Sequence, residues 1–167
     1  MIAMIDYGVG NLFSLSSSLR YLGLETAVTG DAEVLRRADR IILPGVGAFA
    51  DAIAKLRSTG LVDIICEQAA AGKPLLGICL GMQLLFEKSY EYGEHEGLGL
   101  VPGQVVPLAD KLPAGLKVPH IGWNRLQILK KEDPLFKYSG DEEYVYYVHS
   151  YYATDCAENT LAVSEYG

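Results

Sequence analysis

The chain has 167 residues, half of them hydrophobic, with a formal net charge of −7 and a pI near 4.9. This length suits one domain with a substantial core. No apolar run approaches the ~20 residues that a membrane span needs, and the dispersed acidic charge argues against nucleic acid as the main partner. We therefore expect a soluble enzyme domain with neither a membrane nor a nucleic acid as its partner.

The cysteines and the N-terminus bear on the compartment. Cys66, Cys79 and Cys156 are widely spaced and form no metal-ligand pattern. An odd number of such cysteines is typical of reduced thiols in the cytoplasm. The first residues lack the basic region and cleavage site of a signal peptide. We expect a cytoplasmic protein that holds no metal and no cofactor.

The first half alternates short apolar runs with helical periodicity. Strands are predicted at 1–6, 25–29, 40–43 and 74–78, and helices at 12–22, 48–56, 61–71 and 80–88. Strands and helices that alternate over short connections predict a mostly parallel sheet with helices on both faces, as in flavodoxin-like α/β folds.

The pattern changes after residue 97. Strands are predicted at 101–108, 124–129, 144–154 and 160–164, separated by proline, glycine and acidic turns. We interpret this half as a more antiparallel extension of the same sheet. Residues 1–167 are then a single domain.

A nucleophile elbow is predicted where the strand at 74–78 ends. Cys79 stands between Gly77 and Gly81 at a switch from strand to helix. The turn is so tight that a Cβ at either glycine would strike the neighbouring backbone. A lone cysteine among apolar residues is more often core filler, but filler needs neither glycine. The flanking glycines therefore favour a reactive cysteine.

The turn Pro44-Gly45-Val46-Gly47 follows a strand expected beside the elbow strand. Its backbone N–H groups are candidates for an oxyanion hole facing Cys79. The alternative is that Pro-Gly merely ends a strand. The earlier Gly8-Val9-Gly10 is no dinucleotide fingerprint, because Phe13 stands where the third glycine belongs.

Five motifs carry a resemblance that spans the chain. Gly-x-Cys-x-Gly-x-Gln is similar to the elbow of class I glutamine amidotransferases in general. Asp-Tyr-Gly-x-Gly-Asn and Pro-His-Ile-Gly-Trp-Asn narrow the resemblance to the glutaminase subunits of imidazole glycerol phosphate synthases. The motifs occupy residues 6–11, 43–49, 77–83, 119–124 and 148–151.

The resemblance implies roles for single residues. Cys79 would attack the side-chain amide of glutamine, release ammonia and form a thioester that water hydrolyses. The N–H groups of Leu80 and Val46 would form the oxyanion hole, and Gly45 would let that turn flip. Substrate contacts are implied for Gly45, Gly47, Gln83, Glu91, Ser150 and Tyr151. A solvated helix position for Gln83 and a solvated charge for Glu91 remain the alternatives.

The resemblance also implies a partner. This would be the cyclase subunit, a βα barrel that uses the ammonia to make imidazole glycerol phosphate and AICAR in histidine biosynthesis, bound as a heterodimer. Its docking surface is expected to include Asn11, His120, Trp123, Asn124 and Tyr146. Aromatic anchors suit such an interface, although tyrosines are equally common in half-buried strands.

The sequence departs from the family pattern at the catalytic base. The family places His-x-Glu late in the sequence, whereas His95, His120 and His149 are not followed by x-Glu. We interpret the chain as incomplete at its C-terminus and expect it to be inactive in this form. A catalytically inactive module of the same fold, the glutaminase of another amidotransferase, or a cysteine hydrolase that uses a different histidine remain open.

Overall fold

A parallel sheet forms the first half of the molecule. The computed structural model describes residues 1–140 and 142–167. The sheet has the order β2-β1-β3-β4, and its three strand pairs are all parallel. This confirms the predicted parallel sheet. Its strands are β1 Ile2–Ile5, β2 Thr26–Thr29, β3 Arg40–Gly45 and β4 Leu75–Cys79.

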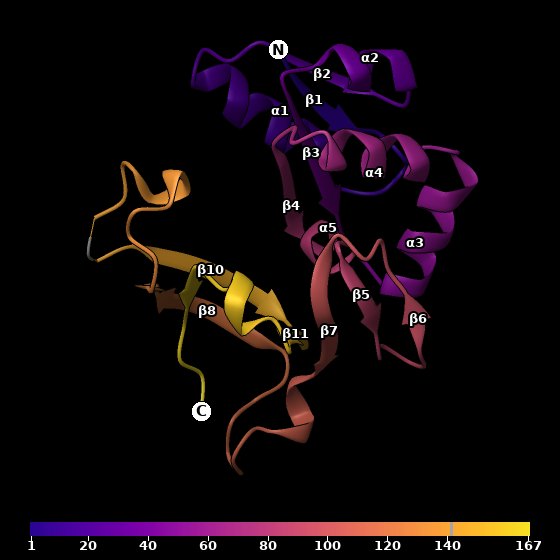
Figure 1. Ribbon diagram of the computed structural model, residues 1–167. Helices are drawn as coiled ribbons and strands as arrows, with labels where there is room; N and C mark the ends of the chain where they lie inside the picture. Colours follow the sequence, from indigo (N-terminus) through magenta and orange to yellow (C-terminus); the bar gives the residue numbers. More distant parts are fainter. Residues whose placement is uncertain (141) are drawn as a thin grey trace.

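Helices lie on both faces of this sheet, as predicted. Figure 1 shows α1 on the side opposite to α2, α3 and α4. The helix α2 was not predicted; its N-cap is Asp31, whose side chain accepts a hydrogen bond of 2.8 Å from the Glu33 N–H. The helices are α1 Leu12–Tyr21, α2 Ala32–Arg37, α3 Phe49–Ser58 and α4 Val62–Ala70.

The core lies between β1, β3 and the helices on one face. Its members are buried apolar side chains, whereas none of the residues of α1 on the other face is buried. Burial of this kind is the main favourable term in folding. No helix among the described residues is long and apolar enough to cross a membrane. The largest core side chains include Ile5, Leu35, Leu43, Phe49, Leu56 and Ile65.

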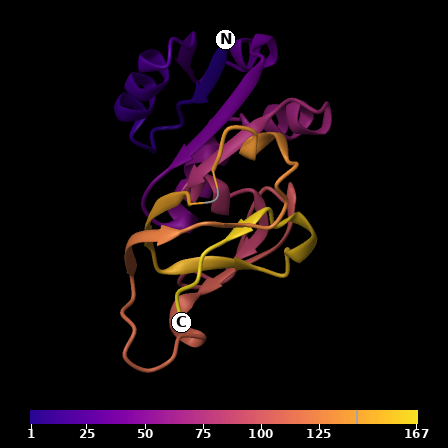
Figure 2. The ribbon, with the colours of Figure 1, turned by 90° about the vertical axis from the view of Figure 1, so that its left-hand side faces the viewer.

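The second half forms three further sheets, which corrects the prediction of one extended sheet. The strands β5 and β7 pair in parallel, and β6 and β11 flank them in the order β11-β7-β5-β6. Two antiparallel ribbons, β10-β8 and β12-β9, complete this half (Figure 2). The strands are β5 Phe86–Ser89, β6 His95–Glu96, β7 Val101–Pro107, β8 His120–Arg125, β9 Gln127–Ile128, β10 Tyr144–His149, β11 Tyr151–Thr154 and β12 Ala162–Val163. Short 3-10 helices occur at Leu108–Asp110, Pro134–Phe136 and Ala157–Asn159.

The predicted helix at 80–88 is wrong. The helix α5 covers only Leu80–Gln83, and the chain then enters β5. Phe86 and Ser89 are buried in that strand, which pairs with β7. The pairing and burial available to an extended chain override the helical spacing of the leucines.

The predicted strand at 144–154 is two strands. It breaks at Ser150, so that β10 pairs with β8 while β11 pairs with β7. The break brings residues 150 and 151 to a point between two sheets. The carbonyl of Ser150 accepts a hydrogen bond of 2.9 Å from the Leu108 N–H, which fixes the crossing point.

Candidate active site

Cys79 occupies a strained turn between β4 and α5. Its φ of 55° and ψ of −120° are unusual for a residue with a side chain, and the cysteine is exposed. A Cβ on Gly77 would lie 2.5 Å from the Met82 Cα, and one on Gly81 would lie 2.0 Å from the Leu43 carbonyl oxygen. Only glycine fits at either position, which agrees with the steric argument for an elbow.

The turn after β3 packs directly on the elbow. A Cβ on Gly45 would lie 2.5 Å from the Gly81 amide nitrogen, so β3 and α5 are in backbone contact. The buried Tyr7 hydroxyl donates a hydrogen bond of 2.7 Å to the Pro44 carbonyl. The glycine at position 45 is thus required by packing, and Tyr7 anchors the start of the turn.

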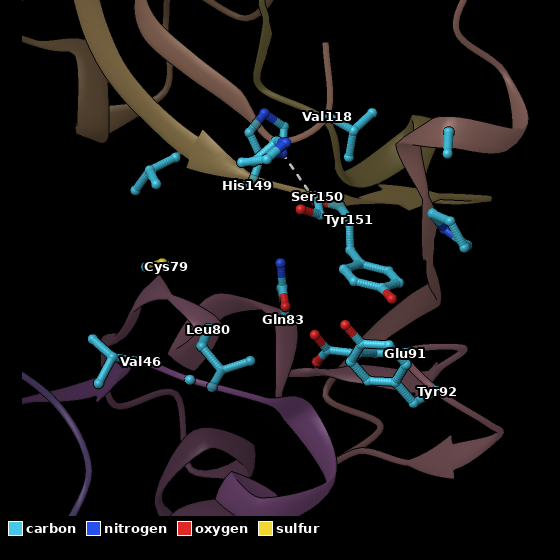
Figure 3. A pocket seen from close by; sticks show the side chains of 15 residues that line it. Val46, Cys79, Leu80, Gln83, Glu91, Tyr92, Val118, His149, Ser150 and Tyr151 are labelled. Atoms are coloured by element: carbon cyan, nitrogen blue, oxygen red, sulfur yellow. Dashed lines mark hydrogen bonds between the residues drawn. The ribbon is translucent and has the colours of Figure 1, made fainter.

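A pocket of about 600 Å³ opens in front of Cys79. In Figure 3, Val46, Cys79 and Leu80 lie on one side of the pocket, and His149, Ser150 and Tyr151 lie on the other. All but one of the residues predicted for catalysis, the oxyanion hole or substrate contact line it; Gly45 does not. Those that do are Val46, Gly47, Cys79, Leu80, Gln83, Glu91, Ser150 and Tyr151.

Glu91 has a structural partner as well as a place in the pocket wall. One carboxylate oxygen accepts a hydrogen bond of 2.6 Å from the Phe49 N–H, the first residue of α3. That helix has no side-chain cap of its own, so Glu91 supplies an acceptor to its N-terminus. The solvated-charge alternative is therefore wrong for Glu91.

Tyr151 and Tyr92 close the pocket beside Glu91. The two rings meet edge to face with centroids 6.5 Å apart. Burial raises the pKa of the Tyr151 phenol, and the negative charge of Glu91 raises it further. Tyr151 is therefore a neutral donor at physiological pH.

Several pocket residues were not predicted. Tyr92 follows Glu91, and the others lie at the end of β7 and in the 3-10 helix after it, just before β8, and at the end of β10. Two signals were available: Tyr92 stands next to an implied substrate residue, and Pro119, Val148 and His149 stand in the motifs at 119–124 and 148–151. The unpredicted lining residues are Tyr92, Pro107, Ala109, Val118, Pro119, Val148 and His149.

His149 lines the pocket, yet both of its ring nitrogens are engaged elsewhere. Its Nε2 lies 2.9 Å from the Nδ1 of His120, and its Nδ1 lies 2.9 Å from the Tyr151 carbonyl oxygen. Among the described residues, no hydrogen bond joins a histidine to the Cys79 sulfur. The nucleophile thus has no base bonded to it in this part of the chain.

Four of the five residues predicted for the docking surface lie on the β8–β10 ribbon and divide between its two faces, whereas Asn11 lies at the start of α1. Trp123 is 68% exposed and Tyr146 is 54% exposed, and their rings meet at 5.5 Å across the strands. His120 departs from the prediction, because only 3% of it is exposed and it lies on the opposite face. Asn124 is half-buried on that same face, where its amide donates to the Glu165 carbonyl at 2.9 Å. Asn11 caps α1 by accepting from the Ser14 N–H at 3.2 Å.

Comparison with known proteins decides the family. A family model described as "Glutamine amidotransferase class-I" matches residues 3–166. The chain belongs to the class I glutamine amidotransferases. Curated relatives named "Imidazole glycerol phosphate synthase subunit HisH" confirm the narrower resemblance. Those of Sulfurimonas denitrificans and Lactococcus lactis subsp. lactis are 50% and 48% identical, over 100% and 99% of this chain and 81% and 80% of their own lengths.

Solved structures of low sequence identity share the fold. A crystal structure of a glutamine amidotransferase superposes with a TM-score of 0.73 at 18% identity, covering 97% of this amidotransferase and 79% of that chain. The glutaminase domain of Trypanosoma brucei CTPS with bound acivicin has a TM-score of 0.65 at 17% identity, covering 98% and 75%. These likenesses support the fold of this family member.

Proposed function

We propose that this chain is the glutaminase subunit of an imidazole glycerol phosphate synthase. It hydrolyses glutamine to glutamate and ammonia and delivers the ammonia to a cyclase subunit in histidine biosynthesis. The observation that carries the proposal is the strained Cys79 elbow facing a pocket of about 600 Å³, in a chain 50% identical to a named subunit of that enzyme. A reducing compartment such as the cytoplasm suits a mechanism that needs a free thiol at Cys79.

The chemistry follows from the elbow. The Cys79 sulfur adds to the side-chain carbonyl carbon of glutamine, and the thiol proton passes to the amide nitrogen. The C–N bond then breaks, which releases ammonia and leaves the glutamyl group on Cys79 as a thioester. Water then adds to the thioester, and the C–S bond breaks to give glutamate and the free thiol. The Leu80 N–H, at the first position of α5, has no acceptor within the helix and is a donor for the oxyanion. The Val46 N–H is the second donor in this proposal.

The far side of the pocket would hold the amino-acid end of glutamine. Glu91 offers a carboxylate to the α-ammonium group, and Gln83 offers an amide. The backbone at Ser150 and the neutral Tyr151 phenol suit the α-carboxylate. This leaves the side-chain amide pointing toward Cys79.

The exposed aromatic face of the β8–β10 ribbon is the proposed docking surface for the cyclase. Trp123 and Tyr146 form its centre, and Ile121, Tyr144 and Val148 extend it. All five alternate along their strands with residues of the opposite face. Large, stiff aromatic side chains of this kind are typical anchors of protein interfaces. Docking there would form a heterodimer.

A catalytically inactive module of the same fold is a second candidate. The observation that favours it is the absence of a hydrogen bond between Cys79 and any histidine among the described residues. The family's His-x-Glu is also missing from residues 1–167. We therefore expect these residues alone to release ammonia slowly, since removal of a histidine base sharply reduces acyl-transfer rates.

The test uses an electrophilic glutamine analogue, because alkylation needs the nucleophile and the pocket but not the full cycle. Mass spectrometry of the treated protein should find one adduct, on Cys79, and glutamine should protect against it. Burial and the charge of Asp63 raise the pKa of the half-buried Cys66, so that thiol should react slowly.

A Cys79→Ala variant is the control and should take up no adduct while remaining folded. Equal labelling of Cys66 and Cys79, or labelling that glutamine does not slow, would contradict a glutamine site at the elbow. Ammonia release in the presence of the cyclase then separates the glutaminase from the inactive module.

A further inference from the structure

Two histidines face each other beneath the aromatic ribbon. The antiparallel register of β8 and β10 places His120 directly opposite His149. The Nδ1 of His120 lies 2.9 Å from the Nε2 of His149, which is a hydrogen-bond distance between two ring nitrogens. One of these inner nitrogens must carry a proton for the contact to be attractive.

The outer nitrogens of the pair also need protons. The Nε2 of His120 lies 2.8 Å from the side-chain oxygen of Asn124, whose amide nitrogen donates to the Glu165 carbonyl. The Nδ1 of His149 lies 2.9 Å from the Tyr151 carbonyl. Carbonyl oxygens only accept, so both outer nitrogens donate. Three contacts require three protons, whereas two neutral imidazoles carry two.

Every neutral arrangement leaves two acceptors facing each other. With both protons on the outer nitrogens, two lone pairs meet between the rings. A proton moved to the inner nitrogen of His149 leaves its Nδ1 lone pair against the Tyr151 carbonyl. A proton moved inward on His120 leaves its Nε2 lone pair against Asn124, and turning the Asn124 amide sets its oxygen against the Glu165 carbonyl.

We propose that His120 and His149 share one extra proton, so that the two rings carry a single positive charge and hold the Tyr151 carbonyl in place. The proton is taken from solvent through the half-buried His149. A fourth proton is excluded because it would place N–H groups on both inner nitrogens. Deprotonation returns the proton to solvent and leaves one of the unfavourable contacts described above.

The surroundings of the pair suit one charge and oppose a second. The rings of Tyr147 and Tyr166 stack on His120 with centroids 5.0 and 3.8 Å away, which favours a cation. Their hydroxyls donate elsewhere, to Ser164 and to the Lys117 carbonyl. Burial lowers the pKa of His149, the hydrogen bond to the Tyr151 carbonyl offsets part of that effect, and the charge of His120 lowers the pKa further. Among the described residues, no carboxylate is bonded to either ring.

The shared proton would affect the pocket through the peptide group between Tyr151 and Tyr152, whose carbonyl oxygen contacts His149. Ser150 and Tyr151 line the pocket, and His149 is the residue that precedes them. The pair is therefore a positioning element for that wall, with no contact to the reacting atoms. This consequence rests on the proposed glutamine site, whereas the shared proton itself does not.

Nitrogen-15 NMR of the full chain tests the proposal without glutamine or any assay of activity. Only three histidines are present, so ring signals can be assigned by substitution. At pH 7.5 a histidine with the usual pKa of about 6.5 is roughly one-tenth charged. We expect three protonated nitrogens out of four in the pair at that pH. The backbone amide signals of Tyr151 and Tyr152 should move with the midpoint at which the pair loses its third proton.

Variants make the result decisive. His95→Gln removes the histidine outside the pair and should leave the midpoint unchanged. Asn124→Asp places a negative charge beside the Nε2 of His120 and should raise the midpoint by about one pH unit or more. The proposal would be overturned by two neutral rings at pH 7.5. It would also be overturned if the backbone amide signals of Tyr151 and Tyr152 did not move at the pH at which the pair loses its third proton. Because glutamine is absent, failure of the glutaminase function would leave these outcomes unaffected.

Discussion

The hydrogen bond from Tyr7 to the turn after β3 gives a direct test of how that turn is held. Tyr7 is 4% exposed, and its hydroxyl donates to the Pro44 carbonyl at 2.7 Å, two residues before Val46. Tyr7→Phe keeps the buried ring and removes only the hydroxyl, so packing is preserved. The Pro44 carbonyl then loses this buried donor.

The expected cost is about 1.5 kcal/mol, within the range of about 1–3 kcal/mol for a buried polar group left without its partner. With a urea m-value near 2 kcal/mol/M, the unfolding midpoint should fall by roughly 0.7 M. Tyr21→Phe is the matched control, because Tyr21 is 91% exposed and should be neutral. A Tyr7→Phe protein as stable as that control would refute the anchoring argument.

The same residue predicts a pH dependence. Burial raises the pKa of Tyr7 from 10.0 to about 12. The folded state therefore holds this proton more tightly than the unfolded state, so the stabilisation is complete below pH 10 and is lost as the pH rises toward about 12. The difference in stability between wild type and Tyr7→Phe should narrow over this window. A difference that stays constant from pH 9 to 12 would contradict the assignment.

Two other substitutions test the elbow and the pocket wall. Gly81→Ala should destabilise the protein by about 3 kcal/mol or more in urea unfolding, because its Cβ would lie 2.0 Å from the Leu43 carbonyl oxygen. Gly30→Ala, where the nearest atom is 3.2 Å away, is the milder control, and equal losses would contradict the packing argument. Glu91→Ala should cost about 1 kcal/mol through loss of the acceptor for Phe49, and Glu91→Gln should retain most of that stability while weakening glutamine binding. An unchanged unfolding midpoint for Glu91→Ala would contradict the capping role.

The parallel sheet and the elbow could be predicted because their signals are local. Short apolar runs between helical segments define β1, β3 and β4. The two glycines around Cys79 indicate a turn too tight for a Cβ, and they lie within two residues of the cysteine that the turn exposes. The short helix at 32–37 was missed because one capping aspartate is a weak signal.

The second half was harder to predict because its strands depend on distant partners. The leucines at 80, 84 and 85 have helical spacing, and only the pairing of residues 86–89 with β7 makes the end of this segment extended. The run of tyrosines from 144 onward has nothing in its composition to mark the break at Ser150. That break exists because β8 and β7 are different neighbours on either side of it.

Contacts between distant segments also limit what could be predicted for the pocket residues. All the residues implied by the resemblance except Gly45 line the pocket together, although residues 46–47, 79–91 and 150–151 are distant segments of the sequence. The roles of Glu91 as a helix cap and of His149 as half of a pair could not be predicted, since each depends on one atom brought close by folding. His120 was placed on the docking surface because its motif lies there, but strand alternation turns its side chain to the buried face.

The two sides of the pocket are held by different kinds of force. On the Cys79 side, Gly45, Gly77 and Gly81 bring β3, β4 and α5 into backbone contact, so the elbow itself has no room to move, whereas a Cβ on Gly47 in the adjoining turn would meet nothing within 4 Å. On the other side, residues 150 and 151 are held by hydrogen bonds from the Leu108 N–H and from His149. Steric contact resists displacement steeply, whereas a hydrogen bond can be exchanged when protonation changes. Adjustment of this site to a ligand or a partner is therefore expected in the turn at 46–47 and in the β10–β11 wall, whose strand β10 also carries the exposed aromatic face.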